Sequence, residues 1–176
     1  MRPSGLVAAP PDPARRYALP PDGPAAEHAG EFVDILIVED DQGDLELTLH
    51  AFKQAKITNP VQLVHDGAEA LDFLFCRGRY AERNMELRPQ LVLLDLHLLK
   101  ISGLEVLRRI TRDTRTRTIP VIVLTVSQRD RDIRECQRLG AETYIIKPVN
   151  FVNFSKVTPQ LTLRWALLEP SLAARP

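Results

Sequence analysis

The chain has 176 residues, of which 44% are hydrophobic and 26% are charged, the balance of an ordinary globular protein. Its 23 basic and 23 acidic residues cancel to a formal net charge of zero. Because nucleic acids and anionic membranes are both negatively charged, a neutral chain argues against either as its main partner. No apolar run approaches the roughly 20 residues that a membrane-spanning helix needs, and the N-terminus lacks the continuous apolar core of a secretory signal. We therefore expect a cytoplasmic protein.

The first 30 residues differ in composition from the rest of the chain. They hold seven of its 14 prolines and few large apolar side chains, so they cannot form a core of their own. Three explanations remain open: a flexible arm, a strap that lies on the domain, or a start codon placed too far upstream. We expect a proline-rich arm at residues 1–30, one folded domain at residues 31–168 and a short tail at residues 169–176.

From residue 32 onward, short apolar runs alternate with segments of helical periodicity. The expected elements are, in chain order, a strand at 32–38, a helix at 42–56, a strand at 61–64, a helix at 68–75, a strand at 91–94, a helix at 103–112, a strand at 121–124, a helix at 130–139, a strand at 143–146 and a helix at about 150–168. Pro159 falls inside the last helix and is expected to kink or break it. Five apolar strands that alternate with helices predict an α/β fold: a doubly wound parallel sheet with helices on both faces.

Polar residues stand at the carboxyl ends of four of these strands. Glu39 and Asp40 follow the first strand, Asp95 the third, Thr125 the fourth and Lys147 the fifth. In open parallel sheets, ligands bind at this edge, where the strand order changes direction. Taken singly, an acid after a strand is more often a helix cap, and a lysine is more often solvated. Together the acids, the hydroxyl and the lysine predict a metal-assisted site for phosphoryl groups.

The order and spacing of these residues resemble the receiver domain of two-component response regulators over residues 32–168. Successive intervals of 55, 30 and 22 residues separate Asp40, Asp95, Thr125 and Lys147. The resemblance implies a flavodoxin-like fold with strand order 2-1-3-4-5. Two stretches, residues 39–44 and 73–80, together with the long segment before Leu91, look like the stand-alone regulators that serve bacterial phytochrome kinases.

The resemblance also implies a role for each residue of the site. Asp95 would be the nucleophile that becomes the aspartyl phosphate. Mg²⁺ would be held by side chains of Glu39, Asp40 and Asp95 and by the backbone carbonyl of His97. Lys147, followed by a cis proline, would contact the phosphoryl oxygens. Thr125 and Tyr144 would form the switch that responds to phosphorylation, and His97 and Ser127 would tune the lifetime of the phosphate.

Two positions near the site depart from the family pattern, and one of them is Ser102, which precedes Gly103 where an acid is common. Receiver domains usually have a proline four residues after the nucleophile, but here that position is Leu99. We therefore expect a looser loop after Asp95.

The expected function is that of a signalling switch with weak phosphotransfer and autodephosphorylation activity only. A sensor histidine kinase, in the narrower resemblance a bacteriophytochrome, would donate the phosphoryl group, and output would pass through protein contacts. A homodimer through the C-terminal third is expected from an apolar surplus in that segment, formed by Leu161, Leu163, Trp165, Leu167 and Leu168. Two alternatives remain: an interaction module that is not phosphorylated, and a phosphatase of the haloacid dehalogenase type. The phosphatase would need a second acid where this chain has His97.

Overall fold

The computed structural model describes residues 33–57, 59–126 and 130–156. Its strands are β1 (Ile35–Val38), β2 (Val61–Val64), β3 (Leu91–Asp95), β4 (Val121–Thr125) and β5 (Thr143–Ile146). Its helices are α1 (Gln42–Gln54), α2 (Gly67–Leu74), α3 (Gly103–Arg112) and α4 (Asp130–Arg138), with a short 3-10 helix, η2 (Gly78–Tyr80). Residues 151–156 are also helical. None of the helices described is long and apolar enough to cross a membrane.

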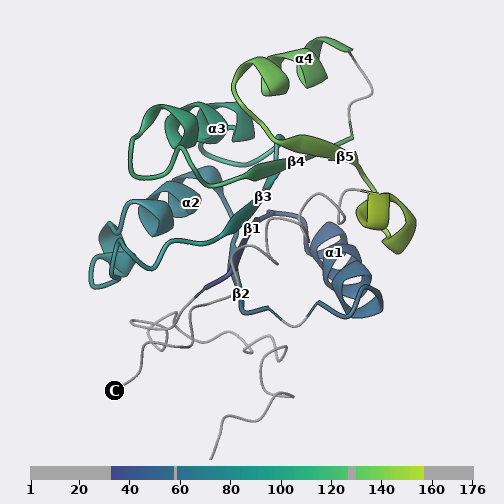
Figure 1. Ribbon diagram of the computed structural model, residues 1–176, viewed down its shortest axis with the longest axis horizontal. Coiled ribbons are helices and arrows are strands. Elements are labelled where there is room, and N and C mark those ends of the chain that lie inside the picture. The colour runs from purple at the N-terminus through teal and green to yellow at the C-terminus, as the bar shows by residue number, and fades with distance from the viewer. Residues whose placement is uncertain (1–32, 58, 127–129, 157–176) are drawn as a thin grey trace, which may run out of the picture.

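The five strands form one parallel sheet in the order β2-β1-β3-β4-β5 (Figure 1). This confirms the predicted doubly wound fold and its strand order. The chain leaves β1 toward β2 at one edge and returns to β3 on the other side of β1. The strand order therefore changes direction between β1 and β3, which is where such sheets bind their ligands.

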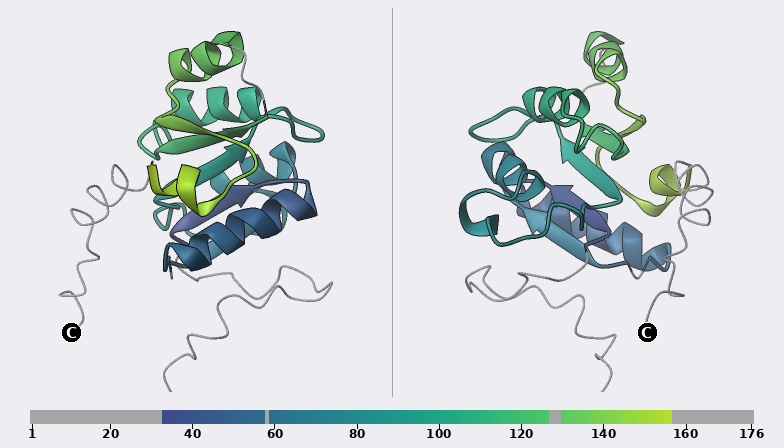
Figure 2. Two further views of the ribbon diagram at one scale, coloured as in Figure 1. Left: turned by 90° about the vertical axis from the view of Figure 1, so that its right-hand side faces the viewer. Right: turned by 60° about the vertical axis from the view of Figure 1, so that its left-hand side comes forward.

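Alternating side chains on the strands fill two separate apolar layers. Leu36 and Val38 of β1 face the layer that contains α2, α3 and α4. Ile35 and Ile37 face the other layer, which contains α1 and Phe154 of the helix at residues 151–156. The left view of Figure 2 shows α1 and this short helix in front of the sheet, with α3 behind it. Both faces are covered, which explains why the three central strands, β1, β3 and β4, are buried throughout and apolar up to the polar residues at their carboxyl ends.

Side-chain caps fix where three helices begin. The side chains of Asp41, Asp66 and Ser102 accept hydrogen bonds from backbone amides three residues ahead, at 2.8, 2.8 and 3.4 Å. Such caps satisfy amides that have no partner within the helix. Because helices in this fold run back from the carboxyl edge of the sheet, all three caps lie near that edge.

The predicted elements agree with the structure except at their ends. β1 begins at Ile35. Asp34, just before it, still bonds through its backbone to Pro60 and Leu91, and its side chain accepts hydrogen bonds from Asn59 and Gln90. The sequence analysis missed η2, a helix too short to show periodicity. The expected last helix begins as predicted, but Pro159, the arm at residues 1–30 and the tail at residues 169–176 lie outside the described residues.

Two glycines let the loop after β3 pack closely between α2 and α3. A Cβ atom on Gly103 would lie 2.0 Å from the backbone oxygen of Asp95, and one on Gly67 would lie 2.0 Å from that of Ile101. Neither backbone oxygen can move without moving the strand or the loop. These two positions therefore require glycine for close approach, and Gly103 holds α3 against the end of β3.

We predict that Gly103→Ala lowers the free energy of unfolding by at least about 1–3 kcal/mol, the usual cost of overpacking. Gly43→Ala is the matched control, because a Cβ there meets only the movable Asp41 side chain at 3.2 Å. The control should change stability by no more than about 1 kcal/mol. Urea unfolding of both variants measures the difference, and equal stabilities would contradict the close approach.

Candidate functional site

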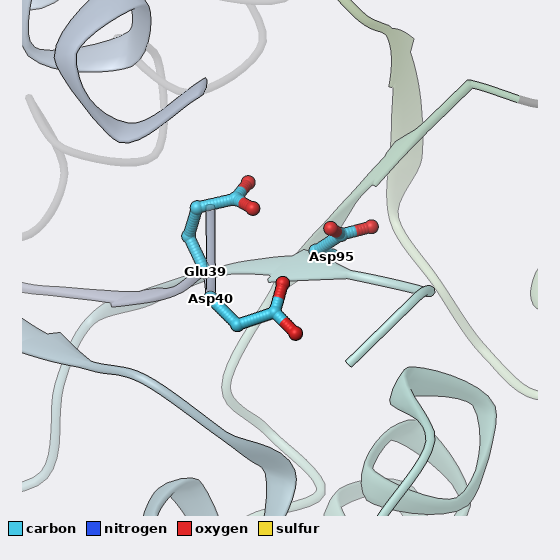
Figure 3. Close-up of side chains that lie close together, drawn as sticks. All are labelled: Glu39, Asp40 and Asp95. Atoms are coloured by element: carbon cyan, nitrogen blue, oxygen red, sulfur yellow. The ribbon is translucent and has the colours of Figure 1, made fainter. Parts of the chain in front are cut away.

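The carboxyl edge of the sheet brings the predicted polar residues together. Glu39 and Asp40 directly follow β1, and Asp95 is the last residue of β3. Because Val38 pairs in register with Leu94, the three acids leave two neighbouring strands at the same level. Carboxylate oxygens of all three lie within 4.8 Å of one another. Figure 3 shows the three side chains directed into the same space.

Two of these acids are buried, so their charges need compensation. Glu39 is 2% exposed and Asp95 is 3% exposed, whereas Asp40 is partly exposed. Adjacent carboxylates repel each other, and burial in a medium of low dielectric constant strengthens the repulsion. Burial raises the pKa of Glu39 from 4.5 to about 7, and the nearby Asp95 charge adds to the rise against the opposing effect of Lys147.

Lys147 supplies the compensating charge from the end of β5. Its Nζ atom lies 2.7 Å from Glu39 Oε2, 2.7 Å from Asp95 Oδ2 and 2.8 Å from Asp44 Oδ2. Burial by itself lowers the pKa of this ammonium, but its hydrogen bonds to the acids outweigh that effect and hold the pKa above its usual value. The side chain is 5% exposed, and the Lys147–Pro148 peptide bond is cis, as the resemblance implied.

Asp44 is a member of the site that the sequence analysis missed. Its spacing predicts an acid in the first turn of a helix, where the helix dipole favours negative charge. It does lie there, in α1, but its side chain also reaches Lys147. The signal in the sequence was its place near the N-terminus of a helix, because helix N-termini meet the carboxyl edge of a parallel sheet.

Glu39 Oε2 gives a direct test of whether the site suits a metal ion. This atom is buried and receives no hydrogen bond of ordinary geometry, although the Lys147 ammonium lies close by. Buried carboxylate oxygens rarely remain so unless a cation or water completes their coordination. Three carboxylates, one of them open to solvent, are the ligands that a hard divalent cation prefers. The residues present therefore fit such an ion.

Backbone amides of the loop after β3 orient two of the acids. Asp95 Oδ1 accepts a hydrogen bond from His97 N at 3.0 Å, and Asp40 Oδ2 accepts one from Leu99 N at 3.1 Å. Lys100 pairs with Asp66 at 2.5 Å, which ties the same loop to the start of α2. A looser loop stays a prediction, but Leu99 gives the loop one contact that a proline could not make, because a proline at position 99 would lack the amide that contacts Asp40.

Thr125 and Tyr144 lie on the same side of the sheet. Thr125 ends β4 and is 1% exposed, and its backbone oxygen accepts from Lys147 N at 2.8 Å. Tyr144 pairs in register with Val123, two residues before Thr125, and is partly buried against the layer that contains α3. The side chain of His97 is 62% exposed. Ser127 lies outside the described residues.

Comparison with known proteins identifies the family. Residues 35–158 match the model of the response regulator receiver domain. A probable methanogenesis regulatory protein, FilR2 of Methanothrix harundinacea, is 37% identical over 131 residues, which cover 74% of this chain and 82% of FilR2. Response regulator Rcp1 of Synechocystis sp. is 34% identical over 131 residues, which cover 74% of this chain and 87% of Rcp1.

Solved structures give the same result. The bacteriophytochrome response regulator RtBRR is 44% identical with a TM-score of 0.68, over 74% of this chain and 78% of its own. The Mn²⁺-bound form of Rcp1 is 33% identical with a TM-score of 0.64, over 78% of this chain and 96% of its own. With its fold, its strand order and its acidic edge, the chain belongs to the family of response regulator receiver domains.

Proposed function

We propose that this receiver domain accepts a phosphoryl group on Asp95 from a sensor histidine kinase. The observation that supports it best is the arrangement around the Asp95 carboxylate. One oxygen is held by the Lys147 ammonium at 2.7 Å and the other by the His97 amide at 3.0 Å. These contacts fix the direction of the carboxylate, and positioning of this kind accounts for most of the catalysis in phosphoryl transfer.

The proposed step exchanges one bond to phosphorus for another. A carboxylate oxygen of Asp95 forms a bond to the phosphorus of a phosphohistidine, while the bond from phosphorus to the imidazole nitrogen breaks and the nitrogen keeps its electron pair. Negative charge collects on the oxygens of the phosphoryl group in transit. Lys147 already lies beside Asp95 and neutralises part of that charge as a point cation.

Mg²⁺ is the cation that we propose for the site. The side chains of Glu39, Asp40 and Asp95 and the backbone carbonyl of His97 would hold it, and it would supply positive charge at the phosphoryl oxygens. The three side chains lie within 4.8 Å of one another, and a relative, Rcp1, has been solved with Mn²⁺ bound, an ion that takes the same hard oxygen ligands.

Thr125 and Tyr144 are proposed as the switch that reports phosphorylation. Thr125 is at the same strand edge as Asp95, one strand away, where its hydroxyl would donate a hydrogen bond to the new phosphoryl group. Tyr144 is only partly buried on that side of the sheet, and its ring would move inward when Thr125 shifts. A local charge change would in this way alter a surface that other proteins contact.

For the partners, we propose a kinase of the bacteriophytochrome class in the cytoplasm. The support is the 44% identity to a bacteriophytochrome response regulator. We also propose that a homodimer forms through the C-terminal third, whose residues beyond 156 lie outside the described part of the chain. The apolar residues Leu161, Leu163, Trp165, Leu167 and Leu168 cannot all face one core from one helix, and two-fold dimers are the commonest closed assembly.

Asp95→Asn should abolish covalent phosphorylation. After incubation with Mg²⁺ and acetyl phosphate, intact mass measurement should show one added phosphoryl group on the wild type and none on the variant. Asp113→Asn is the control, because Asp113 pairs with Arg115 away from the strand edge, and it should label like the wild type. Undiminished labelling of Asp95→Asn would refute the assignment.

Mg²⁺ binding should weaken as the pH falls below about 7. In the metal-free protein, Glu39 has its pKa raised to about 7, so below that pH the ion must displace a proton. The apparent dissociation constant should then rise by up to about tenfold per pH unit. The same raised pKa affects the stability of the metal-free protein. Glu39 stabilises the fold at pH values below 4.5, its pKa in the unfolded chain, and this contribution is lost as the pH rises through about 7, its pKa in the folded protein.

Isothermal titration with Mg²⁺ at several pH values measures this dependence. Glu39→Gln removes the titrating group, so it should bind Mg²⁺ more weakly but with little change across the same range. An affinity of the wild type that stays constant between pH values well above and well below 7 would contradict the role of Glu39.

Truncation before Arg164 should convert the dimer to a monomer. Sedimentation of the full chain and of the truncated chain, with and without acetyl phosphate, measures the change. A full chain that remains monomeric at high concentration in both conditions would end the dimer proposal while leaving the phosphorylation proposal intact.

A further inference from the structure

A second concave surface lies between α2 and α3, away from the acidic edge. These helices contact each other on the same side of the sheet (Figure 1), and the groove at their junction has a volume of about 370 Å³. Leu71 and Phe75 line it on the α2 side, and both are largely buried. The groove therefore combines apolar side chains with a wide opening to solvent.

Arginines surround this apolar surface. Arg77, Arg108, Arg109 and Arg112 line the groove together with two acids, Glu105 and Asp113. Four positive and two negative side chains leave a net charge of +2 there, in a chain whose formal net charge is zero. The groove is therefore a local concentration of positive charge.

The two acids are already engaged by neighbouring arginines. Glu105 pairs with Arg108 at 2.6 Å and with Arg109 at 2.9 Å. Asp113 pairs with Arg115 at 2.7 Å. Arg77 and Arg112 are exposed and form no direct ion pair with any residue that the structure describes. These two guanidinium groups keep their donors available for an incoming carboxylate.

Guanidinium groups also lie over the one aromatic ring of the groove. Arg77 lies 5.3 Å and Arg115 lies 5.1 Å from the centre of the Phe75 ring. The ring and the guanidinium groups therefore form one continuous surface, apolar at its centre and cationic at its margin. An apolar centre with a charged rim is the usual layout of a protein docking site.

The groove runs along α3 from Glu105, in the first turn, to Arg112 and Asp113 at the far end, and its far end is well separated from Asp95. Gly103, at the start of α3, packs against Asp95, whereas Arg112 ends that helix. At 1.5 Å per residue, these two ends lie roughly 13 Å apart along the helix axis. A partner held at the far end of α3 leaves the acidic edge open to a kinase.

We propose that the groove between α2 and α3 docks an acidic segment of a partner protein, with an apolar side chain of that segment packed against Leu71 and Phe75. Carboxylates of the segment would pair with Arg77 and Arg112. A second copy of this chain fits less well, since an isologous contact would set arginines against arginines. A nucleic acid also fits less well, because Glu105 and Asp113 interrupt the positive track that a phosphate backbone needs.

Because Arg112 lies at the opposite end of α3 from Asp95, docking there would not depend on phosphorylation. The surface would hold a partner near the receiver before and after the phosphoryl group arrives. This differs from the output expected of the switch residues, Thr125 and Tyr144, which depends on the phosphorylated state.

Fluorescence anisotropy with the full chain tests the proposal. The probe is a short fluorescein-labelled peptide of glutamate and leucine, compared with its glutamine and leucine counterpart and with a short single-stranded DNA. The wild type should bind the acidic peptide more tightly than either, and more weakly as salt rises. Arg77→Glu with Arg112→Glu should weaken binding by about tenfold or more, because like charges then oppose each other.

Lys53→Glu with Lys56→Glu is the matched control. It makes the same change in net charge at exposed positions at the end of α1, on the opposite face of the sheet from the groove, and should leave peptide affinity within about twofold. Arg77→Gln with Arg112→Gln, checked by its unfolding midpoint, separates lost contacts from misfolding. Asp95→Asn should bind the peptide like the wild type.

Three results would overturn the proposal. One is a wild type that does not bind the acidic peptide. Another is an equal loss in the groove variant and its charge-matched control, which would show a nonspecific charge effect. The last is tighter binding of the single-stranded DNA, lost in the groove variant, which would assign the groove to nucleic acid.

Discussion

The contact of one buried ammonium with three carboxylates is the interaction on which the acidic edge depends. Lys147 directly follows β5, and its ammonium contacts three acids on other elements. Glu39 follows β1, Asp44 lies in α1 and Asp95 ends β3. Without that cation, two of these acids would be ionised in a nearly dry environment next to each other, at a cost of several kcal/mol. The contact also joins segments more than 100 residues apart, since Lys147 and Asp44 are separated by 103 positions. Charge balance and tertiary structure are therefore coupled at this point.

The sequence predicted the parts of the site that follow from sheet geometry alone. Parallel strands end at one edge, so acids after β1 and β3, a hydroxyl after β4 and a lysine after β5 had to converge, and they do. Two contacts could not be predicted from the sequence. The contact of Asp44 with Lys147 depends on the angle at which α1 packs on the sheet. The hydrogen bond from the Leu99 amide to Asp40 depends on the conformation of the loop after β3. The short helix η2 was missed for a similar reason. It is held by contacts with neighbouring elements, such as the hydrogen bond of 2.7 Å from the Tyr80 hydroxyl to Glu69 of α2, and such contacts leave no periodic pattern in the sequence.

The two ends of α3 serve different purposes in this account. Its N-terminus, capped by Ser102, packs through Gly103 against the backbone of Asp95, the residue proposed to be phosphorylated. Its C-terminal half carries arginines that suit the negative end of the helix dipole. One of them, Arg112, forms no ion pair with the residues that the structure describes, and neither does Arg77 across the groove. One helix thus connects the proposed phosphoryl site, where charges are balanced, to the proposed docking groove, where positive charge remains free.

A double-mutant cycle on Lys147 and Glu39 tests the central charge balance most directly. Urea unfolding without metal, at a pH well above 7 where Glu39 is ionised, would compare Lys147→Met, Glu39→Gln and the double variant with the wild type. The account predicts that Lys147→Met alone costs about 3 kcal/mol or more. It also predicts that Glu39→Gln recovers part of this loss, with a coupling energy above about 1 kcal/mol. Effects that simply add would show that the ammonium does not compensate the buried carboxylate and would contradict the account.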